Sequence, residues 1–103
     1  MREEQKITFV AKIKSKSGRE AQVKSELLKL IQPTRAEAGC LSYDMHESLD
    51  EPGLFLFYEN WKTKKHIDAH FETLHVRSIL AAVSDLLASP PELTSWKLIG
   101  ESK

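Results

Sequence analysis

Residues 39–75 read GCLSYDMHESLDEPGLFLFYENWKTKKHIDAHFETLH, and this stretch decides the fold. In its first part, Leu41, Tyr43 and Met45 alternate with polar residues, which is the two-residue period of a half-buried strand. Turn residues follow at 50–53 (DEPG), and the apolar run LFLFY begins immediately after them. The stretch therefore predicts a β-hairpin that runs directly into a helix.

The second strand of this hairpin is apolar on both faces. Leu54 to Tyr58 follow one another without a polar residue, and successive side chains of a strand point to opposite faces. Helices can cover only one face of a small sheet, whereas two apolar faces both need cover. We therefore expect a homodimer in which the open face of the sheet meets a second copy of the protein.

Two helical segments are expected after the hairpin. Thr63 is a residue type that caps helices, and a break between the segments is expected at or near His75. The apolar stripes of the two segments are Ile67, His70, Phe71 and Leu74 in the first, and Val76, Leu80, Val83 and Leu87 in the second. The sequence SPP at 89–91 ends the second segment.

A strand and another helix are expected before the hairpin. Residues 7–13 (ITFVAKI) alternate with the period of a half-buried strand. Ser17 and Glu20 have the spacing of a capping box, which predicts a helix that starts at Gly18. Pro33 lacks a backbone N–H, so it should kink or split this helix.

A last strand is expected over residues 92–100 (ELTSWKLIG), where Thr94, Trp96 and Leu98 lie on one face. The complete order of elements is β-α-β-β-α-β. This order predicts an α+β fold of the ferredoxin-like type, with a four-stranded antiparallel sheet and helices on one face.

The size and charge of the chain set limits on its class. The chain has 103 residues, and we expect one domain over residues 1–103. Its 15 Lys and Arg balance 15 Asp and Glu, so neither nucleic acid nor a membrane surface is an expected partner. The beginning MREEQKITFV lacks the apolar run of a signal peptide, so we expect a cytoplasmic protein. Cys40 is the single cysteine and has no partner for an internal disulfide.

Four segments carry a resemblance to a known family. They are GCLSYD at the second strand, ENW at the end of the third, AHFETLH in the following helix and the terminal SWKLIG. The chain resembles the antibiotic biosynthesis monooxygenase (ABM) domain family, whose dimeric α+β barrels include quinol and anthrone monooxygenases. The resemblance implies a pocket between sheet and helices, and a dimer in which two sheets face each other.

The resemblance also implies an oxygenase chemistry that needs no metal or flavin cofactor. The expected substrate is a small electron-rich aromatic of the quinol or anthrone type. It loses a proton, and the resulting anion gives an electron directly to O2, so the protein must bind and orient the substrate and accept the proton.

His70 is the first candidate for the proton acceptor. It lies on the inward stripe without an expected carboxylate partner, so burial should lower its pKa and keep the imidazole neutral near pH 7. The alternative is a core histidine that hydrogen-bonds a carbonyl group. His75 and Tyr58 are the next catalytic candidates, although His75 could instead be a structural residue at a helix end.

The expected substrate pocket contains Asn60, Trp61, Phe71 and Leu80. Tyr58 and Asn60 share one face of their strand, while Glu59 and Trp61 share the other. These residues cannot all line one pocket unless a bulge intervenes. Glu59 and Trp61 could equally form a hydrogen bond at the strand end and a plug in the core.

No metal or haem site is expected. His66 and His70 have a spacing that can bind zinc from one helix, but the glutamate of the metalloprotease pattern is absent. In the haem-degrading branch of the family a histidine of the second helical segment binds the iron, and the aligned position here is Leu80. Phe71, Val76 and Ile79 offer no substitute ligand.

The sequence therefore favours a cofactor-independent monooxygenase. The alternatives are a non-catalytic dimeric module, which is either small-molecule-binding or stress-associated, and an isomerase of a small metabolite. The lack of a glycine-rich phosphate loop and the neutral charge argue against an isomerase of sugar phosphates.

Overall fold

The protein is described by a computed structural model over residues 6–101, so the predicted domain, residues 1–103, extends beyond the described part at both ends. The elements are β1 (Ile7–Lys14), α1 (Glu20–Leu28), α2 (Ile31–Arg35), β2 (Cys40–Glu47), β3 (Leu54–Trp61), α3 (Lys64–Phe71), α4 (Leu74–Val83), the 3-10 turn η1 (Ser84–Leu86) and β4 (Glu92–Trp96).

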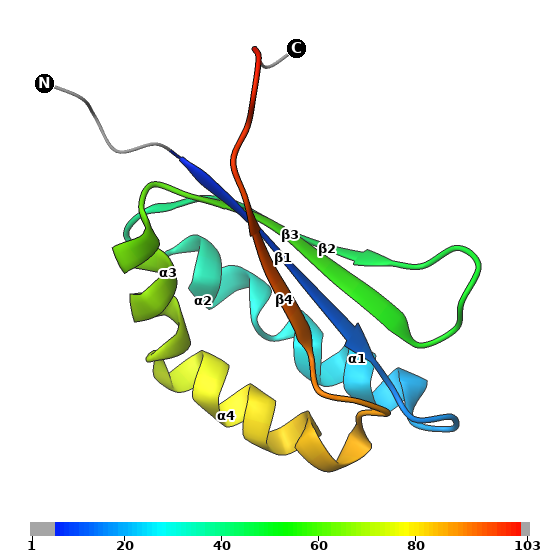
Figure 1. Cartoon of the computed structure of the whole chain (residues 1–103). Helices are drawn as coiled ribbons and strands as arrows, with labels where there is room; N and C mark the ends of the chain where they lie inside the picture. The colour runs from blue at the N-terminus through cyan, green and yellow to red at the C-terminus, as the bar shows by residue number, and fades with distance from the viewer. Residues whose placement is uncertain (1–5, 102–103) are drawn as a thin grey trace, which may run out of the picture.

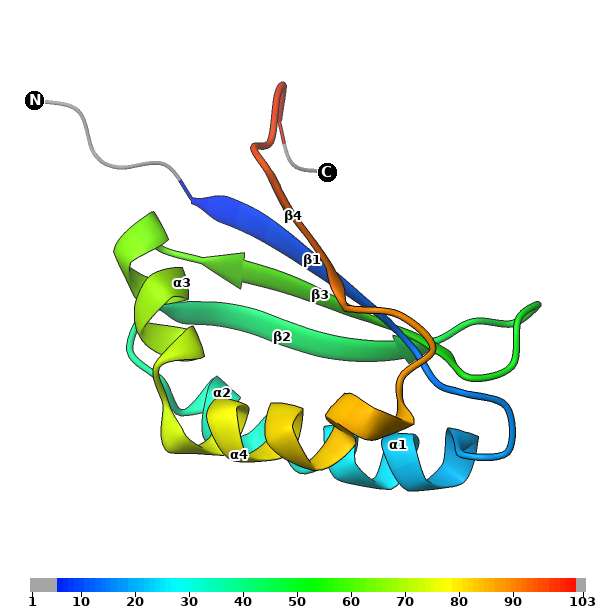
Figure 2. The same ribbon diagram turned by 60° about the horizontal axis from the view of Figure 1, so that its bottom comes forward.

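The four strands form one antiparallel sheet in the order β2-β3-β1-β4. Figures 1 and 2 show the helices together on one face of this sheet. The predicted ferredoxin-like α+β fold is therefore confirmed. The long hairpin of β2 and β3 and the pairing of β1 between β3 and β4 place the core under the middle of the sheet.

β3 has apolar side chains on both faces, as its sequence predicts. Phe55, Phe57 and Trp61 face the helices and are buried. Leu56 and Tyr58 point to the opposite face, where Tyr58 is 44% exposed and lies opposite Val10 of β1. Leu56 and Val10 on this open face are partly exposed.

The capping box predicted at the start of α1 is wrong. Ser17 makes no cap, and Arg19 occupies the N-cap position without a side-chain hydrogen bond. The chain turns at Gly18, where φ is 87°, so Ser17 lies before the turn instead of at the helix end. Glu20 Oε1 accepts a hydrogen bond from the Gly18 N–H at 2.9 Å, and the helix begins at Glu20 instead of Gly18.

The helix containing Pro33 is split, as predicted. The break between α1 and α2 falls at Lys29 and Leu30, before the proline itself. This position follows from the geometry of a helix, because a proline ring clashes with the carbonyl group four residues earlier, here that of Lys29.

Threonine caps begin both helices after the hairpin. Thr63 accepts from the His66 N–H, as predicted, and Thr73 accepts from the Val76 N–H at the start of α4. The helix axis restarts at Thr73, so Leu74 does not continue the stripe of α3. The prediction of Leu74 as an inward residue is wrong, since it is 80% exposed.

Gly39 fixes the entry into β2. Its φ is 86°, and a Cβ atom at this position would overlap the imidazole of His66. Only glycine adopts this conformation readily and leaves room for α3. The turn that carries Glu37 is thereby held against α3.

The last strand is shorter than predicted. β4 ends at Trp96, and Leu98 and Ile99 beyond it are 51% and 81% exposed. Over residues 6–101, no helix has the length and apolar character needed to cross a membrane.

Candidate functional site

A mostly apolar cavity lies between the sheet and the helices. Its apolar walls include Ala11, Ile13, Phe57, Phe71, Val76 and Leu80. Leu93 of β4 also lines it and is 48% exposed, so the cavity reaches the surface beside β4. The cavity has a volume of about 50 Å³, which is room for a few water molecules. An aromatic ligand would therefore need side chains at this mouth to move outward.

Three titratable side chains also line the cavity: Tyr43, Glu59 and His70. Each is at most 3% exposed. Tyr43 is strongly desolvated, which raises the pKa of its hydroxyl and keeps it protonated. The acid-base chemistry available in the cavity near neutral pH therefore belongs to Glu59 and His70.

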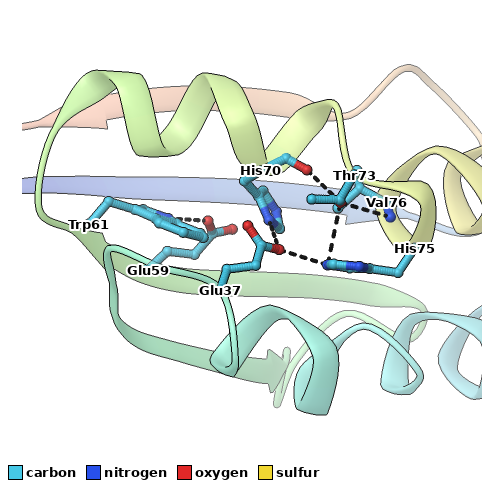
Figure 3. Close-up of polar contacts among 7 residues, drawn as sticks. All are labelled: Glu37, Glu59, Trp61, His70, Thr73, His75 and Val76. Atoms are coloured by element: carbon cyan, nitrogen blue, oxygen red, sulfur yellow. Dashed lines mark hydrogen bonds and ion pairs between the residues drawn. The ribbon is translucent and has the colours of Figure 1, made fainter.

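His70 lies at the end of α3, among aromatic rings. Its ring centroid is 4.9 Å from that of Trp61 and 5.1 Å from that of Phe71. Nδ1 lies 2.8 Å from Oε2 of Glu37 (Figure 3). A carboxylate accepts, so Nδ1 carries the proton in this pair and Nε2 holds the free lone pair.

Burial lowers the pKa of His70, although the hydrogen bond and negative charge of Glu37 act in the opposite direction. The direction agrees with the sequence prediction, but the expected absence of a carboxylate partner is wrong. Glu37 lies 33 positions away in the sequence and reaches His70 from the turn before β2. In the sequence, Glu37 is recognisable only as an acidic residue near Gly39. Neither property predicts a contact with α3.

Glu37 joins His70 to His75. Nε2 of His75 lies 2.6 Å from the same Oε2 atom, and Thr73 Oγ1 lies 3.3 Å from that nitrogen. The side chains of His70, Glu37 and His75 are 3%, 12% and 23% exposed, so this series of hydrogen-bonded side chains runs from the cavity wall toward solvent. His75 lies in the first turn of α4 and is not a wall of the cavity.

Glu59 is the second functional residue that the sequence analysis did not select. It is 2% exposed and lies on the helix-facing side of β3. Oε1 accepts from the indole N–H of Trp61 at 2.9 Å, which is the hydrogen bond at the strand end that the sequence left as an alternative. Burial, and secondarily the charge of Glu37, raise the pKa of Glu59 to about 7. Alternation along β3 could have shown this placement, because Glu59 shares a face with Phe57.

The sheet separates Tyr58 and Asn60 from His70. Asn60 accepts from Thr8 Oγ1 at 2.6 Å and donates to Ser42 Oγ at 2.9 Å, so it links three strands on the open face. The irregularity in the register lies in β2, between Cys40 and Ser42, and does not turn β3.

The predicted pocket residues thus divide into separate groups. Phe71 and Leu80 line the cavity with His70. Trp61 is fully buried behind it as a core residue, and Asn60 is on the other face of the sheet. This protomer therefore does not form the predicted single pocket of Asn60, Trp61, Phe71 and Leu80.

Glu37, His70 and His75 are also the candidate metal ligands among residues 6–101. Their ligand atoms all lie within 4.8 Å of one another. Two imidazoles and a carboxylate can bind zinc. A metal ion would have to replace both hydrogen bonds to Glu37 Oε2. The pair considered from the sequence is different, because Nδ1 of His66 lies 2.8 Å from Thr63 Oγ1 at the start of α3.

Comparison with known proteins gives the family of this chain. The sequence profile described as "Antibiotic biosynthesis monooxygenase" matches residues 6–82, which include every side chain of the Glu37, Glu59, His70 and His75 group. The chain belongs to the antibiotic biosynthesis monooxygenase family.

Individual relatives of this chain are also known. The Bacillus subtilis protein called "Putative monooxygenase YcnE" is 33% identical over 92 residues, covering 89% of this chain and 97% of YcnE. A Synechocystis protein, sll1783, is 38% identical over 68 residues, which are 66% of this chain. The match spans 46% of the length of sll1783, so this chain corresponds to less than half of that relative.

A solved structure of a similar protein shares the fold. The crystal structure of PA3566 from Pseudomonas aeruginosa superimposes with a TM-score of 0.90 at 27% identity. The superposition covers 97% of this chain and 100% of PA3566.

Proposed function

We propose that the protein is a cofactor-independent monooxygenase that oxidises a small electron-rich aromatic, of the quinol or anthrone type, with O2. One observation carries the proposal: His70 faces an apolar cavity while Glu37 holds its Nδ1 at 2.8 Å. This arrangement leaves Nε2 as a positioned proton acceptor in a mostly apolar site. Such a base accelerates proton transfer by roughly 10² to 10⁴-fold.

The proposed reaction begins when His70 takes a proton from the substrate. The anion transfers one electron to O2, and the substrate radical combines with superoxide to form a C–O bond. A second proton then leaves the same carbon, the O–O bond breaks and water departs. For an anthrone-type methylene the balance is CH2 + O2 giving C=O + H2O, so the substrate supplies all four electrons.

Glu37 and His75 support this step without contacting the substrate. Glu37 fixes the tautomer and direction of His70, because its carboxylate accepts only when Nδ1 is protonated. His75 donates to the same oxygen and is the more exposed ring. It therefore gives the proton a route from the cavity toward solvent.

A second copy of the chain is part of the proposal. The open face of the sheet presents Leu56, Tyr58 and Trp96, and Trp96 is 59% exposed. Exposed apolar side chains on one face of a sheet are typical of an interface. We infer a homodimer formed through this face.

Oxygen consumption tests the proposed function. The purified protein, treated with a chelator and freed of flavin, is mixed with anthrone and a panel of hydroquinones under an oxygen electrode. The expected result is one O2 consumed per substrate oxidised, with no accumulated hydrogen peroxide. Tight binding of these compounds without O2 uptake would instead support a non-catalytic binding module.

A further inference from the structure

Glu59 and Glu37 are two buried or nearly buried carboxyl groups in unlike surroundings. One oxygen of Glu37 accepts hydrogen bonds from two imidazole nitrogens, at 2.8 and 2.6 Å. Glu59 receives one indole N–H, from Trp61, although it is 2% exposed. A carboxylate buried with one donor is poorly solvated, so its neutral form is favoured. Two carboxyl groups with such different surroundings can take different roles in one reaction.

The position of Glu59 gives it access to the ligand. It lines the same cavity as His70, from β3 instead of α3. Figure 3 shows its carboxyl group on the side of Trp61 that faces Glu37 and His70. Because Trp61 engages Oε1, the other oxygen is left to carry a proton.

We propose that neutral Glu59 is a second catalytic residue, which donates its O–H to the substrate oxygen where negative charge develops when His70 removes the proton. This inference rests on the proposed function and deepens it. The anion formed from a phenol or an enolisable aryl ketone carries its charge on oxygen. A neutral acid in a dry site stabilises that oxygen without adding a negative charge of its own.

The inference also defines the substrate class. The substrate must carry a hydroxyl or keto oxygen conjugated to the position that loses the proton, with the rest of its surface apolar. His70 and Glu59 then contact different atoms of one conjugated system. An apolar aromatic without such an oxygen would leave the O–H of Glu59 without an acceptor in the ligand, which is unfavourable.

The test uses xanthone, a tricyclic ketone without an ionisable proton or an oxidisable methylene. Its binding is followed by fluorescence between pH 6 and 8.5 for the wild type, Glu59→Gln and Glu59→Leu. Wild-type affinity should fall by about tenfold as Glu59 ionises, the worth of one hydrogen bond. Glu59→Gln keeps an N–H donor, so its affinity should stay constant over this range, while Glu59→Leu should bind weakly at every pH.

Tyr43→Phe is the matched control, because Tyr43 supplies the other hydroxyl in the cavity wall. It should keep the pH dependence of the wild type. The inference is overturned if xanthone fails to bind the wild type at pH 6, if Glu59→Leu binds as tightly as the wild type, or if Glu59→Gln retains the alkaline loss. Far-ultraviolet circular dichroism and the thermal melting of each variant verify that it is folded.

Turnover separates this inference from the proposed function. With an oxidisable anthrone, Glu59→Leu should lower kcat by about 10²-fold or more, as for loss of one oxyanion donor. Glu59→Gln should keep most activity and lose the decline above pH 7. A wild type without any O2 uptake would contradict the proposed function, whereas the xanthone titration would still decide whether Glu59 contacts a ligand oxygen.

Discussion

Nδ1 of His70 lies 2.8 Å from Oε2 of Glu37, and this contact joins the end of α3 to the turn before β2. It gives the buried imidazole one fixed hydrogen bond and one free nitrogen. An orienting carboxylate of this kind holds a histidine in the tautomer required of a general base. The pair therefore links the packing of the fold to the proposed chemistry.

Replacing Glu37 by Gln should lower the pKa of His70 further, because both the hydrogen bond and the charge of Glu37 raise it. We expect kcat to fall by about tenfold or more, since the amide can donate to Nδ1 and favour the wrong tautomer. NMR titration of the imidazole protons measures the pKa. Glu72→Gln, an exposed change at the end of α3, is the control. An unchanged His70 titration in Glu37→Gln would contradict this role.

The sequence was sufficient for the fold because its signals are local. The alternation of Leu41, Tyr43 and Met45, the two-faced run of β3 and the cap at Thr63 each report on neighbouring residues. The misplaced start of α1 and the exposure of Leu74 also have local causes, a turn at Gly18 and a new cap at Thr73.

The site was less predictable because it depends on contacts between distant elements. The place of His70 on the stripe of α3 predicts that it points inward, whereas Glu37 reaches it across 33 positions. Tyr58 is a catalytic candidate by residue type alone, since alternation along the strand places it on the face opposite to Glu59. Alternation along a strand therefore shows which side chains face the pocket more reliably than the chemical character of its polar residues does.

The stability of Glu59→Gln relative to the wild type should be higher at high pH than at low pH. The folded pKa of about 7 exceeds the ordinary value of 4.5, so the folded state binds this proton more tightly than the unfolded state. The stabilisation from this protonation is fully present below pH 4.5 and is lost as pH rises through 7. The shift corresponds to about 3 kcal/mol. Urea unfolding measures the free energy of unfolding of both proteins at pH 5 and pH 8.5. The difference between Glu59→Gln and the wild type should change by most of this amount, in favour of the variant, from pH 5 to pH 8.5. The same difference at both pH values would argue against a neutral Glu59.

Leu56→Glu should split the dimer without unfolding the protomer, because Leu56 lies on the open face of the sheet. Phe57→Glu should instead unfold it, since Phe57 is 1% exposed in the core. Sedimentation at micromolar concentration and thermal melting measure the two effects. Leu28→Glu, on the exposed side of α1 at 47% exposure, controls for the same change in side chain. A wild-type monomer at these concentrations would refute the proposed interface.

Removal of metal ions should leave the activity unchanged. The imidazole nitrogens of His70 and His75 that face Glu37 are both engaged in short hydrogen bonds to it. Elemental analysis should find no stoichiometric iron, copper or zinc, and added haem should give no sharp Soret shift, since Leu80, the residue expected at the position of the family's haem ligand, cannot bind iron. Activity that is lost with a chelator and restored by one metal would place that metal among Glu37, His70 and His75.

The most direct test of the central claim is the rate of O2 uptake by His70→Gln with anthrone or the best hydroquinone of the panel. General base catalysis by His70 predicts a kcat lower by about 10² to 10⁴-fold. The dimer should persist, and the melting temperature should stay close to that of the wild type. A folded variant that keeps its activity within a few fold of the wild type would contradict the account.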